Sequence, residues 1–468
     1  ARPGCGQGWG QVALIWISII FYVAVQLAIG VWASRRVHTE GDYLLAGRRL
    51  GLGLASVSLF ATWFGAETVM GSSAAVAEQG LAGGRADPFG YAICLFLMAI
   101  FLAYQMRRRN YVTLGDFFRE RYSPLLERVA VLVLLPAVII WAAAQLLAFG
   151  QILNVLTEVP LALSLVAATV LVILYTTLGG LWGDVVTDAV QGAVLVIGLV
   201  ILLGFVLAAA GGIGAGIAAI EPGQLRLVAP DETGWARLEL WMIPILGSLV
   251  SQEALSRLLA ARSPAIARRA CFAAAGVYLA LGLIPVTIAL VGAHLAPDLA
   301  HRDQFLPVLA ANLLPPVLFA ILIGALLSAI LSTVDSTLLT ASALVSHNLV
   351  VRALPRLSEK GRVRSARIIV VLAGLAAYAI ARGDETILDL VVLASSFGTA
   401  GLLVTVLFGL WTRRGGPMTA LAALIVGFAV TLWGEALFAL EAPFMTAIGA
   451  AALTFLLGAF IRPRPEAA

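Results

Sequence analysis

Residues 58–77 read SLFATWFGAETVMGSSAAVA, an apolar stretch long enough to cross a membrane but interrupted by glycines and polar residues from Gly65 onward. Because lipid cannot satisfy freed backbone carbonyls, irregular backbone at membrane depth is stable only where protein surrounds it. Glu67 would also cost about 2.5–3.5 kcal/mol at a helix centre unless a partner offsets it. The pattern predicts a broken helix that forms a binding site. The alternative is a glycine-rich packing helix with Glu67 near an interface.

The composition of the chain is that of a membrane protein. Of its 468 residues, 61% are hydrophobic and 12% are charged, and the mean hydropathy is +0.99. Soluble proteins usually contain about 25% charged residues, so a soluble fold is excluded. The cysteines Cys5, Cys94 and Cys271 have no metal-ligand spacing. We predict an all-α polytopic membrane protein that is not an enzyme and uses no organic cofactor.

Thirteen apolar windows are long enough to span a bilayer, which takes about 20 residues each. They lie at 11–33, 51–79, 88–106, 126–156, 159–179, 182–210, 239–260, 266–294, 315–350, 366–383, 386–411, 416–436 and 442–461. The first window resembles a signal peptide in its apolar run, but its positive cluster follows that run rather than preceding it. We therefore expect thirteen transmembrane helices.

Basic residues gather in alternate loops of this scheme. If Arg35, Arg36, Arg48 and Arg49 lie in the cytoplasm, the N-terminus is outside and the C-terminus is cytoplasmic. The other basic residues predicted inside are Arg107, Arg108, Arg109, Arg119, Arg121, Arg128, Arg257, Arg262, Arg268, Arg269, Arg352, Arg356, Lys360, Arg362, Arg364, Arg367, Arg413, Arg414, Arg462 and Arg464. The net charge of +4 thus indicates topology in a multi-pass protein of the cell inner (plasma) membrane, not binding to nucleic acid.

A second interrupted window lies at 239–260, where Gly247, Ser248, Ser251, Gln252 and Glu253 break an apolar run. Interrupted helices at corresponding positions of two halves indicate an inverted-repeat transporter with a binding site near the membrane midplane. Counting five helices from each break gives the predicted organisation. Its parts are an external N-terminus with an extra helix (1–50), a first repeat (51–210), an external loop (211–238), a second repeat (239–411), and two extra helices with a cytoplasmic tail (412–468).

Two segments place oxygen-rich side chains inside the predicted membrane region. In GDVVTDAVQG, Asp184 and Asp188 share one helical face, with Asp184 nearer the cytoplasmic mouth. In SAILSTVDSTLLTAS, a face of about 100° holds Ala329 together with the hydroxyls of Ser332, Thr333 and Ser336. The carboxylate of Asp335 lies at its border. Hydroxyls, a carboxylate and unwound carbonyls suit a hard cation such as Na⁺. Hydrogen bonding between helices is the alternative role.

Aromatic residues form the third group. Trp63 lies in the first break, Tyr91 begins the next helix, and Trp141 lies mid-helix with Gln145 one turn further on. Aromatic faces around a buried cavity suit a quaternary ammonium group through cation–π attraction of about 2 kcal/mol or more. They also stack on a sugar ring or an amino-acid side chain. For Tyr91, a place in the interfacial aromatic belt is the alternative.

Three motifs resemble the sodium:solute symporter family, and the resemblance covers roughly residues 35–411. They are GDYLLAGRRLG at 41–51, YTTLGGLWGDVVTDAVQ at 175–191 and LSTVDSTLLTASALVSHNL at 331–349. The resemblance implies a LeuT-like 5+5 inverted repeat and sodium-coupled uptake by alternating access. ATWFG, DPFGYA, YVTLGDFF and WAAAQ are similar to the high-affinity choline transporter branch of the family.

The resemblance also implies ligands for sodium. The main site would use the carbonyls of Ala61, Phe64 and Ala329 and the hydroxyls of Ser332 and Thr333, with Asp188 as an important acid nearby. A second site, present in some members, would involve Asp188, Ser332, Asp335 and Ser336. The family thus implies one or two bound ions.

The same resemblance places Trp63, Tyr91 and Trp141 at choline-cage positions. The chain departs from that branch at Ser251, where another tryptophan is expected, and at Glu67, where a small residue is expected. The predicted substrate is therefore choline-like, another quaternary ammonium or a zwitterion. The competing interpretation is that Glu67, Gln145, Ser251 and Gln252 bind a neutral or anionic solute such as proline, a sugar or a carboxylate. A transporter-like sensor and a channel are rival functions.

The charge pattern makes a testable prediction about orientation. Single cysteines introduced at Gln224 and Lys360, in a background without native cysteines, should react with a membrane-impermeant reagent from opposite sides of the membrane. Labelling of both positions from one side of intact cells would rule out the thirteen-helix scheme.

Overall fold

The computed structural model describes residues 37–461 except 158, 230–231, 296–301 and 384, together with scattered positions between 17 and 35. Most of the predicted first span at 11–33 and the tail after 461 lie outside the described residues. Within the described residues the secondary structure is helical and no strand occurs, as predicted for an all-α protein.

In the described residues from 37 to 209 the chain forms eight α-helices, interrupted by short turns of other helix types. The α-helices are α2 (Glu40–Leu45), α3 (Leu52–Trp63), α4 (Ser73–Gln79), α5 (Tyr91–Phe101), α6 (Ala103–Arg108), α7 (Leu114–Arg121), α8 (Pro124–Thr157) and α9 (Leu161–Ala209). The short turns are η1 (Ala46–Arg48), η2 (Glu67–Ser72), η3 (Gly80–Gly84) and η4 (Arg85–Gly90).

The second part of the chain continues the same pattern. Its α-helices are α10 (Ile213–Ala218), α11 (Gly234–Leu246), α12 (Gln252–Ala260), α13 (Pro264–Gly292), α14 (Phe305–Leu313), α15 (Pro316–Val345), α16 (Val351–Ala353), α17 (Glu359–Ala381), α18 (Ile387–Ser396), α19 (Thr399–Trp411), α20 (Pro417–Phe438) and α21 (Pro443–Ile461). The short turns are η5 (Gly247–Val250), η6 (Ala293–Leu295), η7 (Arg302–Gln304) and η8 (Ser346–Val350).

The number of membrane spans differs from the predicted thirteen when length and composition alone are applied. Among the described residues, eight helices are long and apolar enough to cross a membrane, and nine if the pair α18 and α19, bent by 42°, counts as one span. Short helices such as α3 fail this test because they are halves of broken spans. Conversely, α9 joins two predicted spans at Gly180, whose φ of 60° favours glycine. The count of thirteen stays a prediction.

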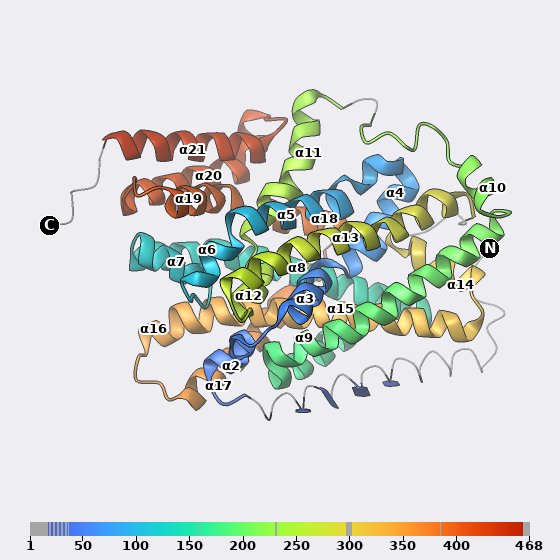
Figure 1. The fold of residues 1–468 in the computed structure, drawn as a ribbon, viewed down its shortest axis with the longest axis horizontal. Coiled ribbons are helices and arrows are strands. Elements are labelled where there is room, and N and C mark those ends of the chain that lie inside the picture. The colour runs from blue at the N-terminus through green and yellow to red at the C-terminus, as the bar shows by residue number, and fades with distance from the viewer. Residues whose placement is uncertain are drawn as a thin grey trace.

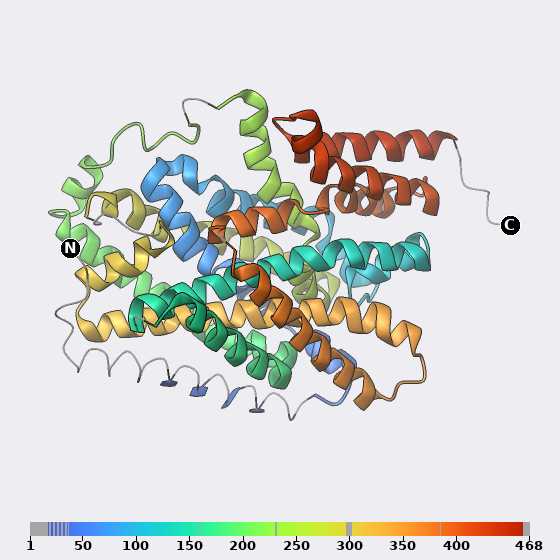
Figure 2. The ribbon, with the colours of Figure 1, turned by 180° about the vertical axis from the view of Figure 1, so that it is seen from behind.

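The long helices run roughly parallel, with α15 near the centre of the bundle (Figure 1). Helix α15 packs against α8, α9 and α17, and also contacts α3 and α12. Seen from behind, α15 and α8 extend along the length of the molecule with α17 beside them (Figure 2). Helices α19, α20 and α21 form a separate group along one side. The side chains of α15 therefore face several elements at once.

The two predicted broken helices are both present. The first consists of α3, a break at residues 64–66, η2 and α4; the second consists of α11, η5, the extended residue Ser251 and α12. Backbone hydrogen bonds tie the start of the first to the end of the second. Leu50 N–H donates to Ala260 O at 3.2 Å, and Arg262 N–H donates to Leu50 O at 2.9 Å.

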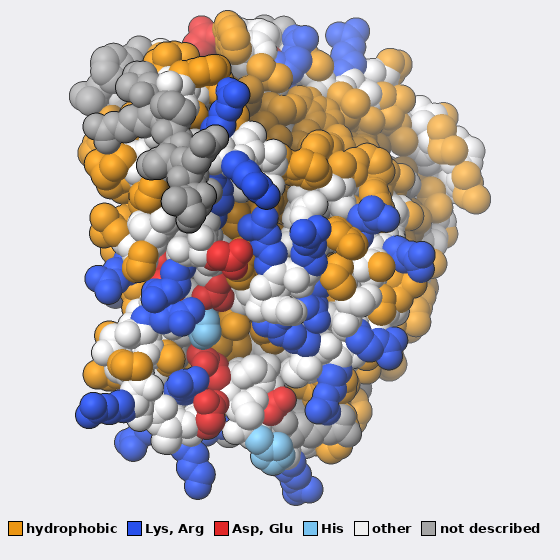
Figure 3. Space-filling model, turned by 60° about the vertical axis from the view of Figure 1, so that its left-hand side comes forward, with side chains coloured by type: hydrophobic (Ala, Val, Ile, Leu, Met, Phe, Trp, Pro, Cys, Tyr) orange, Lys and Arg blue, Asp and Glu red, His pale blue; other side chains and the backbone are white. Residues whose placement is uncertain are grey.

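One end of the bundle is rich in charged side chains. Helices α7, α12, α16 and the first turn of α17 lie at this end, whereas α10 lies at the other (Figure 1). Figure 3 shows Lys and Arg side chains spread across this region, with a row of acidic side chains and histidine among them. The exposed basic residues include Arg108, Arg119, Arg128, Arg262, Arg269, Arg352, Arg356, Lys360 and Arg364.

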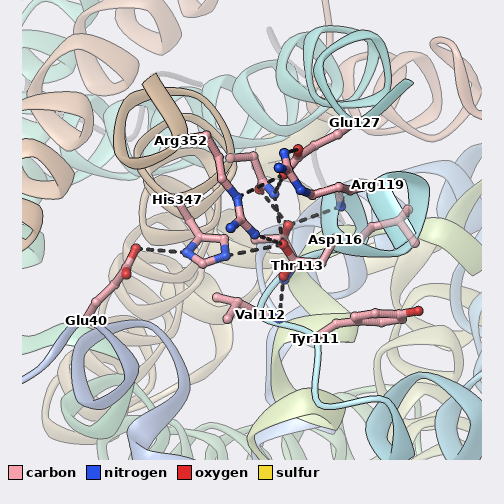
Figure 4. A network of polar contacts seen from close by, with 12 residues as sticks. Glu40, Tyr111, Val112, Thr113, Asp116, Arg119, Glu127, His347 and Arg352 are labelled. Atoms are coloured by element: carbon pink, nitrogen blue, oxygen red, sulfur yellow. Dashed lines mark hydrogen bonds and ion pairs between the residues drawn. The ribbon is translucent and has the colours of Figure 1, made fainter. Parts of the chain in front are cut away.

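At this end a polar network joins four segments that are distant in sequence (Figure 4). His347 on η8 lies 3.0 Å from Glu40 on α2 and 3.3 Å from Asp116 on α7. Arg352 on α16 lies 3.1 Å from Asp116. Glu127, which is on α8, accepts a hydrogen bond from Arg119 at 2.7 Å. The network fixes the ends of α2, α7, α8 and α15 relative to one another.

Asp116 has the most partners in this network. Its Oδ2 accepts hydrogen bonds from the backbone N–H groups of Val112 at 2.8 Å and Thr113 at 3.2 Å. Burial alone would raise the pKa of Asp116, but the hydrogen bond and charge of His347 and the two backbone N–H groups lower this pKa to about 2. A carboxylate whose pKa is lowered in the folded state stabilises the fold above its ordinary pKa and loses that contribution as the pH falls toward 2.

The lowered pKa predicts the effect of removing this charge. Asp116→Asn should lower the free energy of unfolding near neutral pH by roughly 2 kcal/mol. Thermal unfolding of the purified protein in detergent measures the loss, and the gap from wild type should narrow as the pH falls from about 5 to about 3.

Glu120→Gln is the matched control, because the Glu120 side chain is 59% exposed and lies 3.9 Å from its nearest basic partner, Arg109. Equal unfolding midpoints for the two variants at neutral pH would contradict the role given to Asp116.

Candidate functional site

The first break is held within the protein interior. Helix α3 ends at Trp63, and Phe64 leaves helical geometry with φ −83° and ψ 75°. The Phe64 N–H donates to Phe60 O at 3.1 Å, and Gly65 N–H donates to Trp63 O at 3.0 Å. A new helical turn, η2, then begins at Glu67. The backbone N–H groups of Phe64 and Gly65, between the two halves, thus form hydrogen bonds within the chain and are not exposed to lipid.

Side chains from two other elements complete the break. Thr68 Oγ1 donates to Asp87 Oδ2 at 2.6 Å, and the Tyr278 hydroxyl lies 3.1 Å from the same oxygen and 3.2 Å from Trp63 O. Ser72 Oγ donates to the carbonyl of Asp87. All of these side chains are buried. Asp87 and Tyr278 are not among the residues predicted for the site, although an acid within an apolar window is a usable signal for Asp87.

Glu67 lies inside the bundle and not at an interface. It is 0% exposed, and its Oε2 accepts a hydrogen bond from Gln145 Nε2 on α8 at 2.6 Å. Among the described residues, Glu67 Oε1 and Gln145 Oε1 have no hydrogen-bond partner. Because an unpaired buried polar atom is costly, these two oxygens are suited to receive donors from a ligand.

The three aromatic residues singled out from the sequence lie together. The ring centroids of Trp63 and Tyr91 are 5.2 Å apart, those of Tyr91 and Trp141 are 6.2 Å apart, and those of Trp63 and Trp141 are 6.4 Å apart. All three side chains are buried, which excludes an interfacial belt position for Tyr91. The Tyr91 hydroxyl lies 3.3 Å from Ser395 Oγ on α18. The structure therefore brings α3, α5 and α8 to one point.

The second break contributes a small cleft beside Trp141. Ser251 has φ −60° and ψ 128° and separates η5 from α12. A cleft of about 30 Å³ is lined by Trp141, Ser248, Ser251, Glu253 and other residues. Among the described residues, Trp141 Nε1 and Ser251 Oγ have no hydrogen-bond partner.

Gln252 lines the same cleft as Ser251, but its polar atoms are already hydrogen-bonded within the protein. Its Oε1 accepts a hydrogen bond from the Leu114 N–H on α7 at 2.7 Å, and its Nε2 lies 3.2 Å from Ser256 Oγ. The polar atoms of its side chain thus connect α12 with α7 and with its own next turn.

The predicted sodium residues on α9 and α15 also lie together. Asp188 Oδ2 accepts a hydrogen bond from Ser58 Oγ at 2.8 Å, and its Oδ1 accepts one from Ser332 Oγ. Thr333 Oγ1 donates to Ala329 O at 3.1 Å. Ala61 and Phe64 lie in the last turn of α3 and at the break, where helix-terminal carbonyls need partners from outside the helix.

An arginine lies within this cluster. Sequence analysis counted Arg257 with the loop arginines, but its side chain is 1% exposed. It donates to Asp184 Oδ2 at 2.5 Å and to Ser336 Oγ, and it lies 4.0 Å from Asp188. Asp184 is also fully buried rather than at a mouth. Asp335 is fully buried, and neither of its carboxylate oxygens has a hydrogen-bond partner among the described residues.

Gly65 connects the two groups of residues. A Cβ placed on Gly65 would lie 3.1 Å from Thr333 Oγ1, 3.6 Å from Gln145 Oε1 and 3.6 Å from Glu67 Oε2. The hydroxyl of α15 and the polar pair Glu67 and Gln145 therefore face the same point of the break. A side chain at this position would require Thr333 to move by a few tenths of an ångström.

Two broken helices that meet buried acids, hydroxyls and aromatic rings are the arrangement of a membrane-embedded secondary transporter. A model of the sodium:solute symporter family matches residues 43–427. The chain therefore belongs to the sodium:solute symporter family.

Curated relatives of the chain are transporters. The high affinity choline transporter 1 of Homo sapiens is 28% identical over 445 residues, which cover 89% of this chain and 76% of that protein. The sodium/pantothenate symporter of Escherichia coli (strain K12) is 28% identical over 442 residues, which cover 88% of each chain. The chain is thus related to transporters rather than to enzymes.

Solved structures define the fold. A Na⁺-coupled sialic acid symporter in a substrate-bound outward-open state matches with a TM-score of 0.82 at 19% identity, covering 96% of each chain. MhsT in complex with L-phenylalanine matches with a TM-score of 0.53 at 15% identity, covering 87% of this chain and 97% of that one. These neighbours confirm the predicted LeuT-like fold.

The close approach at Gly65 makes a testable prediction. Gly65→Ala should weaken activation of transport by Na⁺ at least about tenfold, because the added Cβ would lie 3.1 Å from Thr333 Oγ1 and displace this proposed sodium ligand by a few tenths of an ångström. The measurement is the Na⁺ concentration that gives half-maximal uptake in proteoliposomes.

Gly53→Ala is the matched control on the same helix, because a Cβ at Gly53 meets no heavy atom within 4 Å. The same sodium dependence in both variants would show that the break is not next to the coupling ion.

Proposed function

We propose that the protein is a symporter that couples inward movement of Na⁺ to the uptake of a small organic solute carrying a positively charged group. Membership of the sodium:solute symporter family supports the coupling ion and the class of function. Each Na⁺ that enters releases about 2.3 kcal/mol per 100 mV of membrane potential, which can drive uptake against a gradient.

The main sodium site of this proposal lies at the first break. Its ligands are the carbonyls of Ala61, Phe64 and Ala329 and the hydroxyls of Ser332 and Thr333, with Asp188 adjacent. Two contacts support it: Ser332 is bonded to Asp188, and Thr333 faces Gly65. Oxygen ligands of this kind replace the hydration shell of a hard cation.

The observation that carries the substrate class is the charge around the aromatic residues. Glu67 and Asp87 are both 0% exposed, and neither makes an ion pair with a basic residue among those described. A buried carboxylate without a counter-ion is costly, so a positive group from the solute offsets its charge. Trp63, Tyr91 and Trp141 add cation–π attraction. The rings contact one another here, so the bound solute must separate them.

The proposed orientation follows from the basic residues. The end of the bundle that carries α7, α16 and the start of α17 faces the cytoplasm, and the loop after α10 faces outside. The distribution of exposed Arg and Lys in Figure 3 supports this orientation in the cell inner membrane.

A second candidate is a symporter for a neutral or anionic solute. Trp141 Nε1 and Ser251 Oγ are buried donors without a partner among the described residues, and such donors suit a carboxylate or a hydroxyl. Relatives named for pantothenate and for sialic acid support this alternative. A zwitterion satisfies both sets of groups, with its positive end near Glu67 and its carboxylate near Ser251.

The test is sodium-driven uptake in proteoliposomes with competing solutes. Choline or betaine should compete, and Trp141→Ala should weaken their binding at least about tenfold through loss of a desolvated cation–π partner. Trp141→Phe should have a smaller effect. Glu67→Gln should weaken binding of choline more than binding of betaine, because only choline carries a net charge.

Trp433→Ala is the matched control, because Trp433 lies on the surface and is 49% exposed. Competition by only a hexose or a carboxylate would overturn the cationic substrate in favour of the second candidate. Solute binding without sodium-driven uptake would instead identify a sensor.

A further inference from the structure

The cluster of predicted sodium residues on α9 and α15 already contains a positive charge from the protein itself, the guanidinium of Arg257. Arg257 extends from α12, the second half of the second broken helix, and its side chain is buried. Its Nη2 donates to Asp184 at 2.5 Å and to Ser336. It also lies 4.0 Å from Asp188. Asp188 and Ser336 are two of the four residues from which a second sodium site was expected.

The oxygen atoms around the Arg257 guanidinium already form hydrogen bonds within the protein. Ser336 Oγ lies 2.8 Å and 2.9 Å from the two carboxylate oxygens of Asp184. Ser332 Oγ lies 3.3 Å from Asp184 and donates to Asp188. A sodium ion at these oxygens would lie within a few Å of the positively charged guanidinium. Two positive charges at that distance repel strongly in a medium of low dielectric constant.

A count of charges on α9 leads to the same result. Asp184 and Asp188 bring two carboxylates into the bundle one helical turn apart, and both are buried. Arg257 pairs with Asp184. Asp188 then faces the proposed main sodium site through Ser332. One resident cation and one exchangeable cation balance these two carboxylates; Asp335 on α15 is a third buried carboxylate, which lies outside this pair.

We propose that Arg257 takes the place of a second sodium ion, so that the protein couples each solute to a single Na⁺. This inference rests on the proposed function, because it concerns the stoichiometry of the same transport cycle. The guanidinium remains with the protein when the exchangeable ion is released. The proposed main sodium site does not include Asp335, so coupling to a single Na⁺ leaves this acid outside ion binding, although both of its carboxylate oxygens lack a hydrogen-bond partner among the described residues.

The location of Arg257 connects the charge to the moving part of the fold. It is on α12, which begins directly after the extended Ser251, whereas its partners lie on α9 and α15. The ion pair therefore links the second break to the two helices that carry the sodium residues.

The experiment counts sodium ions. Binding of radioactive ²²Na⁺ to the purified full-length protein should give one ion per transporter, and the Hill coefficient for activation of uptake by Na⁺ should be about 1. Arg257→Gln, which removes the charge but keeps an amide donor, should raise the Hill coefficient toward about 2. It should also raise the half-maximal Na⁺ concentration at least about tenfold.

Two further variants separate charge from structure. Arg257→Lys keeps a cation and should keep a Hill coefficient of about 1. Asp335→Asn should leave the number of bound ions unchanged.

Several outcomes overturn the inference. They are two bound ions in the wild type, an unchanged sodium response in a folded Arg257→Gln variant, a second ion requirement in Arg257→Lys, or loss of an ion in Asp335→Asn. If Arg257→Gln fails to fold, the number of Na⁺ ions bound by the wild type and the Hill coefficient of Arg257→Lys still test the inference. Absence of any sodium dependence in the wild type would overturn the proposed function itself, a result distinct from finding two ions.

Discussion

A helix that is interrupted inside a bilayer must bond its free backbone groups within the protein, and the rest of this structure depends on that requirement. The break at residues 64–66 is bonded by its own chain at Phe60 and Trp63, and by Tyr278 from α13. Asp87, held by Thr68 and Tyr278, fixes η4 against the same break. These polar groups bond to one another within the protein, because neither water nor lipid is available there to bond them. A place where polar groups must gather at membrane depth is also a place where an ion or a polar solute can bind.

The same break explains how two ligands can influence each other. Gly65 lies close to Thr333, Glu67 and Gln145, which face the same point of the break. In the proposed cycle, sodium binds beside Thr333 and the solute beside Glu67 and Gln145. A ligand that orders the break lowers the cost of ordering it for the other ligand, and this coupling is reciprocal. No long pathway is required, because one short segment contacts both groups of residues.

The partners of the buried carboxylates differ between the predicted sodium residues and the aromatic site. In the cluster on α9 and α15, the carboxylate of Asp184 is matched by a guanidinium and that of Asp188 by hydroxyls. Near the aromatic residues, Glu67 has one amide donor and Asp87 has two hydroxyl donors, and no basic side chain pairs with either among the described residues. In our proposal the first group functions with a single exchangeable cation. The second binds a solute that brings positive charge.

The sequence alone determined the class of the fold and much of the candidate site. Apolar windows of membrane length gave the helices, and glycines with polar residues located both breaks, because these features depend only on local composition and helical periodicity. The face of α15 that holds Ser332 and Thr333 followed from the same periodicity. The motifs quoted above indicated the family.

Only the tertiary structure decided which side chains from distant elements meet. Tyr278 reaches Thr68 across 210 positions, Arg257 turns inward to Asp184 instead of lying in a loop, and Gln252 bonds to α7. Periodicity assigns a residue to a face of its own helix, but it does not say which helix that face meets. The partner of a buried charge is fixed by the packing of the whole bundle, so these contacts could not be read from the order of the residues.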